Sequence, residues 1–268
     1  MANRTPSTFK SYRSISYSRL IPYFGKFMVK EIKIEHIKKF IEYNYAKKLS
    51  TKTIKNAVTL LGKMFNYFLE KRYIDESPYN GILNLKNDRP KTIRILNEQE
   101  IECILQLAEN INPDLFYMIK IILSTGMKKA EILALKCIDI NFQNKKIFIN
   151  HTLYEGKLLI PTSRTVIREI NMPINLIADF KKLVKGKKHE DFLFTNKRLN
   201  LNTNDNRVRQ HFSQIMNQIE LNEFKFNDLR HTYAYMALQN GISIDHLHKR
   251  LGDYSIQATM DKYRDFIQ

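Results

Sequence analysis

This chain contains few cysteines, few acidic residues relative to basic ones, and no long apolar run. Its two cysteines, Cys103 and Cys137, lie far apart, each beside apolar residues. This placement predicts two reduced core thiols and argues against a disulfide or a cysteine metal site. No segment has the length and hydropathy of a membrane span or a signal peptide. We therefore expect a cytoplasmic protein that makes no membrane contact.

Several motifs that would indicate a cofactor are also missing. The sequence contains no Walker loop, no nucleotide-binding glycine pattern, no zinc-ligand spacing and no internal repeat. His246 and His248 are two residues apart on an expected helix, so their side chains face different directions and do not form a metal pair. The sequence predicts neither a cofactor nor a bound metal.

Positive charge is abundant. The 268 residues carry a formal net charge of +17, with an isoelectric point near 9.7. Residues 1–90 contain 18 Lys and Arg against 7 Asp and Glu, whereas the remainder contains 26 against 20. Such an excess indicates a polyanionic partner. By itself it does not distinguish DNA from RNA or from an anionic lipid surface.

The first part of the chain has the periodicity of a small helical domain. We expect a helix over residues 7–22 that Pro22 ends, a second over Ile34–Tyr45, and a third that Ser50 and Thr51 cap. The third helix has apolar residues at helical spacing on one face. Its other face carries Lys52, Lys55, Thr59 and Lys63. That face is either solvated or turned toward phosphates; we favour phosphates, because the positive charge is concentrated in this part of the chain.

A polar segment, residues 86–95, contains Pro90 and lacks any periodicity, which is typical of a linker. We therefore predict an N-terminal helical domain over residues 1–85 and a second domain over residues 96–268. Three short runs with β-branched residues predict a small antiparallel sheet in the second domain. The runs and the further helices that we expect are Lys146–Ile149, Lys157–Ile160, Val166–Met172, Asn175–Val184 and Asn204–Leu221. The predicted fold class is mainly α with a small antiparallel β-sheet.

Two stretches carry motifs. One runs from Thr125-Gly126 to Leu135 and includes Glu131; the other runs from Phe224 to Tyr263. The second holds an Arg-His-Thr sequence, then Leu-Gly, then a late Thr and Tyr. The positions concerned are Arg230, His231, Thr232, Leu251, Gly252, Thr259 and Tyr263. Together they resemble the tyrosine recombinase (phage integrase) family, whose patterns read T-G-x-R-x-x-E-L-x-x-L, H-x-L-R-H-T, L-G-H and T-x-x-x-Y. Residues 1–85 resemble the core-binding domain of the same Xer-like recombinases.

The resemblance implies a two-domain clamp around double-stranded DNA, associated with the nucleoid. It also implies attack of Tyr263 on a backbone phosphate, which forms a 3′-phosphotyrosine and frees a 5′-hydroxyl without metal or ATP. Partner subunits would join it on DNA in a tetrameric synapse. Because only residues 264–268 follow Tyr263, whereas many relatives carry a longer tail that docks on a neighbour, we expect a monomer off DNA.

Four of the six family roles are altered in this chain. Lys128 replaces the first arginine, Asn227 replaces the first histidine, and Asp253 replaces the second histidine or tryptophan. The turn at residues 161–165, where the family carries a proton-donating lysine, contains Arg164 as its one cation. Arg230 keeps the second arginine position. His231 is counted here among the DNA-contacting residues and, in the family, is a structural partner more than a proton shuttle.

Each replacement weakens charge stabilisation or proton transfer. Lysine loses the fork that grips a phosphate with two bonds, and asparagine cannot accept a proton. Asp253 would repel the phosphate unless it paired with a neighbour such as Lys249 or Arg250; Arg164 could reach the phosphate as a substitute. The sequence thus predicts a DNA-binding family member acting in site-specific recombination or integration with impaired strand cleavage. The alternatives are an active recombinase with an atypical site and an unrelated basic nucleic-acid-binding protein.

Overall fold

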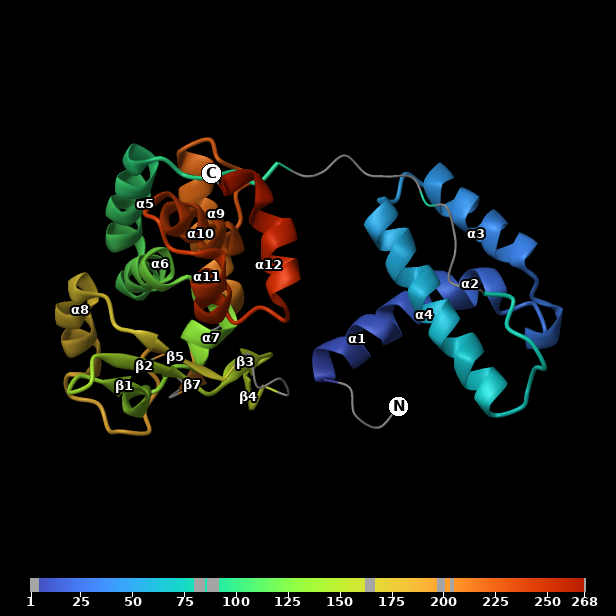
Figure 1. The fold of residues 1–268 in the computed structure, drawn as a ribbon, viewed down its shortest axis with the longest axis horizontal. Coiled ribbons are helices and arrows are strands. Elements are labelled where there is room, and N and C mark those ends of the chain that lie inside the picture. The colour runs from blue at the N-terminus through green and yellow to red at the C-terminus, as the bar shows by residue number, and fades with distance from the viewer. Residues whose placement is uncertain are drawn as a thin grey trace. The chain divides into compact units, whose positions relative to one another are not determined.

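The structure, a computed structural model, describes residues 5–79, 85, 92–161, 167–196, 201–202 and 205–267. It divides into two compact units, residues 1–91 and 92–268, and each is described by itself (Figure 1). The division falls within the segment 86–95 that the sequence marks as a linker. Helices dominate both units, and all described strands lie in the second.

The first unit opens with a nearly continuous helical run. Helix α1 (Pro6–Ile15) passes through a π-helical turn, Ser16–Leu20, into α2 (Ile21–Phe24). The prediction that Pro22 ends this helix is wrong. Proline lacks an N–H and clashes with the preceding turn of a regular α-helix, but it is tolerated in the first turn of a new one, which is where Pro22 lies. The π-helical turn Ser16–Leu20 lies directly before α2, where the ring of Pro22 would clash with a regular α-helix.

Helices α3 (Ile34–Ala46) and α4 (Thr51–Glu70) complete the first unit, together with a short 3-10 turn, Val29–Glu31. The Ser50 side chain accepts a hydrogen bond from the Thr53 N–H at 3.3 Å, so the predicted cap of α4 is confirmed. The helices bury one apolar cluster, which includes Leu20, Phe24, Ile37, Phe40, Ile41, Ile54, Val58, Leu61 and Phe65. That core leaves the lysine-bearing face of α4 outside.

The second unit contains eight α-helices in its described residues. They are α5 (Glu98–Ile111), α6 (Pro113–Thr125), α7 (Lys129–Ala134), α8 (Ile174–Val184), α9 (Asp205–Gln218), α10 (Leu229–Gln239), α11 (Ile244–Leu251) and α12 (Ile256–Tyr263). Helix α6 is the centre of the core because its side chains are apolar nearly all round. It packs against α5 on one side and α10 on another. A helix of this kind is stable only when neighbours cover every face.

The strands form three small antiparallel groups. Strands β1 (Ile140–Asn141), β2 (Lys146–Ile149) and β5 (Arg168–Asn171) make one sheet in the order β1-β2-β5. Strands β3 (Thr152–Tyr154) and β4 (Lys157–Leu159) form a separate hairpin, and β6 (Thr195–Asn196) pairs with β7 (Leu201–Asn202). The predicted antiparallel strands are present, but the second of the three predicted runs lies in the hairpin and not in the sheet.

The prediction that both cysteines lie in the core is wrong for Cys103. Within the described residues both thiols are free, but Cys103 is exposed on α5, and only Cys137 is partly covered by the core. Apolar neighbours in sequence misled the burial prediction for Cys103, since helical geometry turned it outward. None of the described helices is both long and apolar enough to cross a bilayer.

Two glycines end helices at points where the chain passes close to other elements. Gly126 (φ +69°) follows α6, and Gly252 (φ +64°) follows α11. A β-carbon on Gly126 would collide with the Tyr233 ring, and one on Gly252 would lie 2.7 Å from the Arg168 guanidinium. Both positions therefore need glycine for the left-handed backbone and for the space.

A pair of substitutions separates these two requirements. Gly126→Ala should lower the free energy of unfolding by roughly 1–2 kcal/mol for the left-handed backbone and about 1–3 kcal/mol more for the collision with Tyr233. Gly241→Ala is the matched control, because Gly241 has φ +79° and no atom within 4 Å of an added β-carbon. It should show the backbone cost alone. Equal losses for both variants in urea unfolding would contradict the close contact at Gly126.

Candidate functional site

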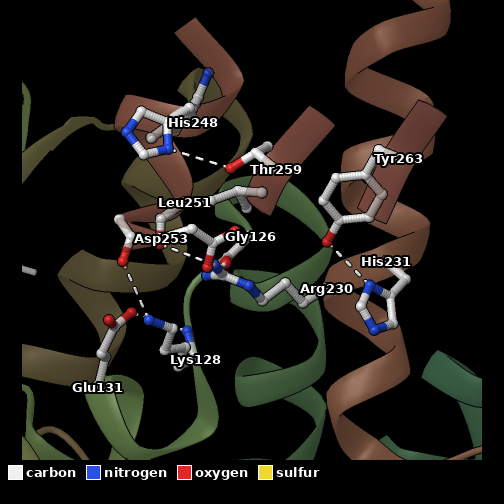
Figure 2. A network of polar contacts seen from close by, with 12 residues as sticks. Gly126, Lys128, Glu131, Arg230, His231, His248, Leu251, Asp253, Thr259 and Tyr263 are labelled. Carbon is white, nitrogen blue, oxygen red and sulfur yellow. Dashed lines mark hydrogen bonds and ion pairs between the residues drawn. The ribbon is translucent and has the colours of Figure 1, made fainter. Parts of the chain in front are cut away.

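Four segments of the second unit converge on one polar cluster (Figure 2). They are the turn from Gly126 to Lys128 that leads into α7, the first turn of α10, the connection from α11 to α12, and the end of α12. Left-handed glycines at the first and third segments let backbone carbonyls turn toward the cluster. The sequence-predicted residues Lys128, Arg230, His231, Asp253 and Tyr263 are all brought together here.

Arg230 is the centre of the cluster. Its Nη1 donates to the Gly126 carbonyl at 2.5 Å, and its Nη2 donates to the Leu251 carbonyl at 2.9 Å and to Asp253 Oδ1 at 2.8 Å. The arginine side chain is 3% exposed and the aspartate side chain 20% exposed. A buried guanidinium needs such acceptors, and a carboxylate is the strongest of them.

The predicted pairing of Asp253 with Lys249 or Arg250 is therefore wrong. Lys249 instead forms an ion pair with Asp245 at 2.6 Å, one turn away on the exposed side of α11. The Arg250 guanidinium lies over the Tyr233 ring, 5.6 Å from its centre. Asp253 reaches inward because the left-handed Gly252 turns the chain back toward α10.

Lys128 occupies the place of the family's first arginine. Its Nζ donates to the Gly252 carbonyl at 3.2 Å, so it points at the same connection that carries Asp253. Burial lowers the pKa of the ammonium, and the nearby Glu131 carboxylate opposes that shift. An ammonium group is a point charge, whereas the guanidinium of an arginine is a fork with two parallel donors.

Glu131 and Arg168 form the frame under the cluster. Each oxygen of Glu131 accepts from one Nη of Arg168 at 2.9 Å, and the two side chains are 0% and 7% exposed. Glu131 also accepts from the Lys128 N–H at 2.9 Å, and Arg168 Nε donates to the Arg250 carbonyl at 2.8 Å. This one pair thus joins β5, α7 and the end of α11.

Tyr263 is fully buried, and its hydroxyl lies 2.9 Å from His231 Nδ1 (Figure 2). Burial raises the pKa of the phenol, and the positive charge of Arg230 works against that rise. Burial, with the charge of Lys262, lowers the pKa of His231 to about 4. The imidazole is therefore neutral near pH 7 and can accept or donate one hydrogen bond at that nitrogen, depending on its tautomer.

The other predicted site residues lie outside the cluster. Asn227 is exposed on the 3-10 turn Phe226–Asp228 and lines a hollow of about 390 Å³ together with Lys129 and Arg209. Arg164 lies outside the described residues. His231 was predicted to contact DNA; it is buried, and its hydrogen bond in the structure is to Tyr263.

Sequence reasoning missed two contributors. Arg168 was noticed only as part of a strand, because nothing in the sequence reveals its long-range partner Glu131. Lys262 was overlooked although it directly precedes Tyr263. Burial near the cluster lowers the pKa of its ammonium, and the Asp253 carboxylate opposes that shift, although the side chain as a whole is exposed.

Histidines provide no metal centre in the parts of the chain that the structure covers. No three His, Cys, Asp or Glu side chains among the described residues gather in a metal-binding group. His248 Nδ1 lies 3.1 Å from the Thr259 hydroxyl and fastens α11 to α12, whereas His246 interacts with Ser243 at the start of α11. Each ring thus has a local structural partner.

In the first unit, Lys52, Lys55, Thr59 and Lys63 all lie on the exposed side of α4. The Lys63 ammonium donates to the Tyr12 hydroxyl at 2.6 Å. The exposed side of α4 is therefore basic, and its Lys63 is held against α1.

Comparison with known proteins identifies the class. The Phage integrase family matches residues 94–266, and the N-terminal SAM-like domain of phage integrases matches residues 2–45. The chain therefore belongs to the phage integrase family, and the resemblance predicted from its motifs is confirmed.

Relatives agree with this assignment. A tyrosine recombinase XerC-like protein of Caldanaerobacter subterraneus is 23% identical, over 99% of this chain and 75% of its own length. The ICEBs1 integrase of Bacillus subtilis is 22% identical over 96% of this chain and 73% of its own length. Among solved structures, the Tn1549 transposon integrase in complex with a circular intermediate DNA has a TM-score of 0.84. It is 19% identical and covers 100% of this chain and 90% of its own. That likeness shows the fold.

The frame of the site can be tested by removing one charge. Glu131→Gln should lower the free energy of unfolding by roughly 3–5 kcal/mol, because it leaves the Arg168 charge buried without its partner. Glu169→Gln is the matched control: Glu169 pairs with Lys146 at 2.6 Å but its side chain is 55% exposed. Breaking that exposed pair should cost less than about 1 kcal/mol. Denaturant unfolding of both variants gives the comparison, and similar losses would contradict the role of Glu131.

Proposed function

We propose that this protein binds a specific double-stranded DNA site as a tyrosine recombinase of the phage integrase family, and that it cleaves that DNA slowly. Residues 1–85 serve as the core-binding domain, residues 86–95 as the linker, and residues 96–268 as the catalytic-type domain. DNA binding would keep the protein at the nucleoid. The observation that carries the slow-cleavage proposal is the ion pair between Arg230 and Asp253.

The chemistry shows why this pair matters. Attack of Tyr263 on a phosphate builds negative charge on the non-bridging oxygens, and the protein must neutralise it with preorganised cations. Arg230 is the one arginine kept at a family phosphate-binding position, and its charge already faces the Asp253 carboxylate. A carboxylate about 4 Å from a phosphate oxygen opposes it by roughly 4 kcal/mol at an effective dielectric of about 20. That amount corresponds to nearly three orders of magnitude in rate.

The remaining groups do not make up the loss. Lys128 contributes charge without a fork, and Asn227 cannot exchange a proton. The DNA-free arrangement also keeps the Tyr263 hydroxyl buried, so the phenol must change its surroundings before it meets a phosphate. Attenuated cleavage follows from these three features together.

One observation favours the alternative, a fully active recombinase with an atypical site. One cluster still holds the side chains of Tyr263, Arg230, Lys128 and His231. A pocket that had lost its geometry would not keep them together. In that case Asp253 would leave Arg230 when DNA binds, and partner subunits would form the synapse.

Trapping the covalent intermediate tests the proposal. A nicked suicide substrate made from DNA that flanks this gene should give a slow protein–DNA adduct, absent in Tyr263→Phe. Asp253→Asn keeps the shape of the side chain and removes its charge, so it should raise the adduct rate by roughly 10- to 1,000-fold. Asp245→Asn is the matched control, because Asp245 pairs with Lys249 away from the cluster, and it should leave the rate unchanged. An Asp253→Asn rate equal to that of the unaltered protein would contradict the electrostatic explanation.

A second measurement tests the DNA-facing role of α4. The double variant Lys52→Gln/Lys55→Gln should weaken DNA binding and reduce the slope of log affinity against log salt by about 2, since each lost phosphate contact removes roughly 0.9. The matched control is Lys181→Gln/Lys182→Gln, which removes the same charge from the exposed last turn of α8. If both double variants change the slope equally, α4 is not the contacting face.

A further inference from the structure

The hydrogen bond between Tyr263 and His231 joins the nucleophile to a group that can exchange a proton. The phenol oxygen and His231 Nδ1 are 2.9 Å apart, and the two rings meet edge to face with their centres 5.7 Å apart. His231 is 9% exposed and Tyr263 is completely covered. No other base contacts the phenol among the hydrogen bonds of the described residues. This geometry is within the range expected of a nucleophile and its base.

We propose that His231 is the base that activates Tyr263, replacing the histidine that this chain lacks at Asn227. This role rests on the proposed function, because it requires some cleavage to occur. The phenol proton moves to His231 Nδ1 while Tyr263 Oη bonds to phosphorus. The bond from phosphorus to the 5′ oxygen breaks, and that oxygen keeps the electron pair and takes a proton from water. On resealing, the 5′-hydroxyl bonds to phosphorus and returns its proton to water, while the phosphotyrosine bond breaks and His231 gives its proton back to Tyr263 Oη.

Asn227 cannot supply this function. An amide neither accepts nor releases a proton near neutral pH, and Asn227 is exposed on the 3-10 turn before α10. His231, in the first turn of α10, faces the phenol directly. The proton-transfer role has thus moved four residues along the chain, to the first turn of the helix that also carries Arg230.

The electrostatic surroundings of His231 prepare it to respond to DNA. Its charged neighbours are Lys262 on α12, Arg230 on α10, Asp228 just before α10, and Asp253 after α11. Burial and the two cations keep the pKa of the free ring near 4, so it is neutral and ready to accept. A bound phosphate adds negative charge, which raises the pKa of a nearby histidine toward the working range of a base.

The test uses the adduct assay in the Asp253→Asn background, where cleavage is faster. His231→Gln retains a polar partner for the phenol but cannot take its proton, so adduct formation should fall at least 100-fold while DNA affinity stays within about threefold. Replacing Tyr263 by 3-fluorotyrosine, whose phenol loses its proton more easily, should restore at least tenfold in His231→Gln and change the parent little. His246→Gln, which alters an exposed histidine, is the matched control and should change nothing.

The outcomes separate the role from simple packing. A His231→Gln rate within threefold of the parent overturns the proposal, and so does a large loss that fluorotyrosine fails to relieve, because that result means positioning alone. The pH profile gives an independent reading: the acidic limb of the cleavage rate should disappear in His231→Gln. If no adduct forms in any background although DNA binds, the proposed slow cleavage is itself wrong and the role of His231 falls with it.

Discussion

The buried ion pair between Glu131 and Arg168 is the interaction on which the site's arrangement depends. Neither charge is exposed enough for water to stabilise it, so each requires the other. The same two side chains also hold the Lys128 N–H and the Arg250 carbonyl. A strand, a short helix and a helix end that are distant in sequence are thereby fixed to one another. The loop that carries Asp253 begins directly beyond this anchor.

Within that frame, Asp253 has two opposite effects. A guanidinium that is 3% exposed would destabilise the fold without an acceptor of negative charge, and Asp253 provides one at 2.8 Å. The same carboxylate competes with any phosphate that approaches Arg230. Where the phosphates of bound DNA neutralise this arginine, the protein needs no carboxylate of its own beside it. This competition for Arg230 is the physical reason for which we propose slow cleavage.

Local patterns in the sequence were enough to predict most helices. Residues Ile54, Val58, Leu61 and Phe65 recur on one face of α4, and Ser50 has few alternatives to its role as a cap, so the helix follows from its own residues. Spacing from Gly126 and Gly252, which end helices, likewise singled out Lys128 and Tyr263, and the Arg-His-Thr motif singled out Arg230. These features depend on neighbours within a few turns.

The remaining features depend on partners far along the chain. Sequence proximity suggested Lys249 or Arg250 as the partner of Asp253, but α11 directs Lys249 toward Asp245 and Arg250 toward Tyr233. The partner is Arg230, which is brought there by the packing of α10 against α11. The sequence therefore identified the charged residues of the site but not the partner of Asp253. Because a cation that is paired with a carboxylate attracts phosphate less than a free cation does, the identity of the partner matters for the chemistry, and the fold specifies it.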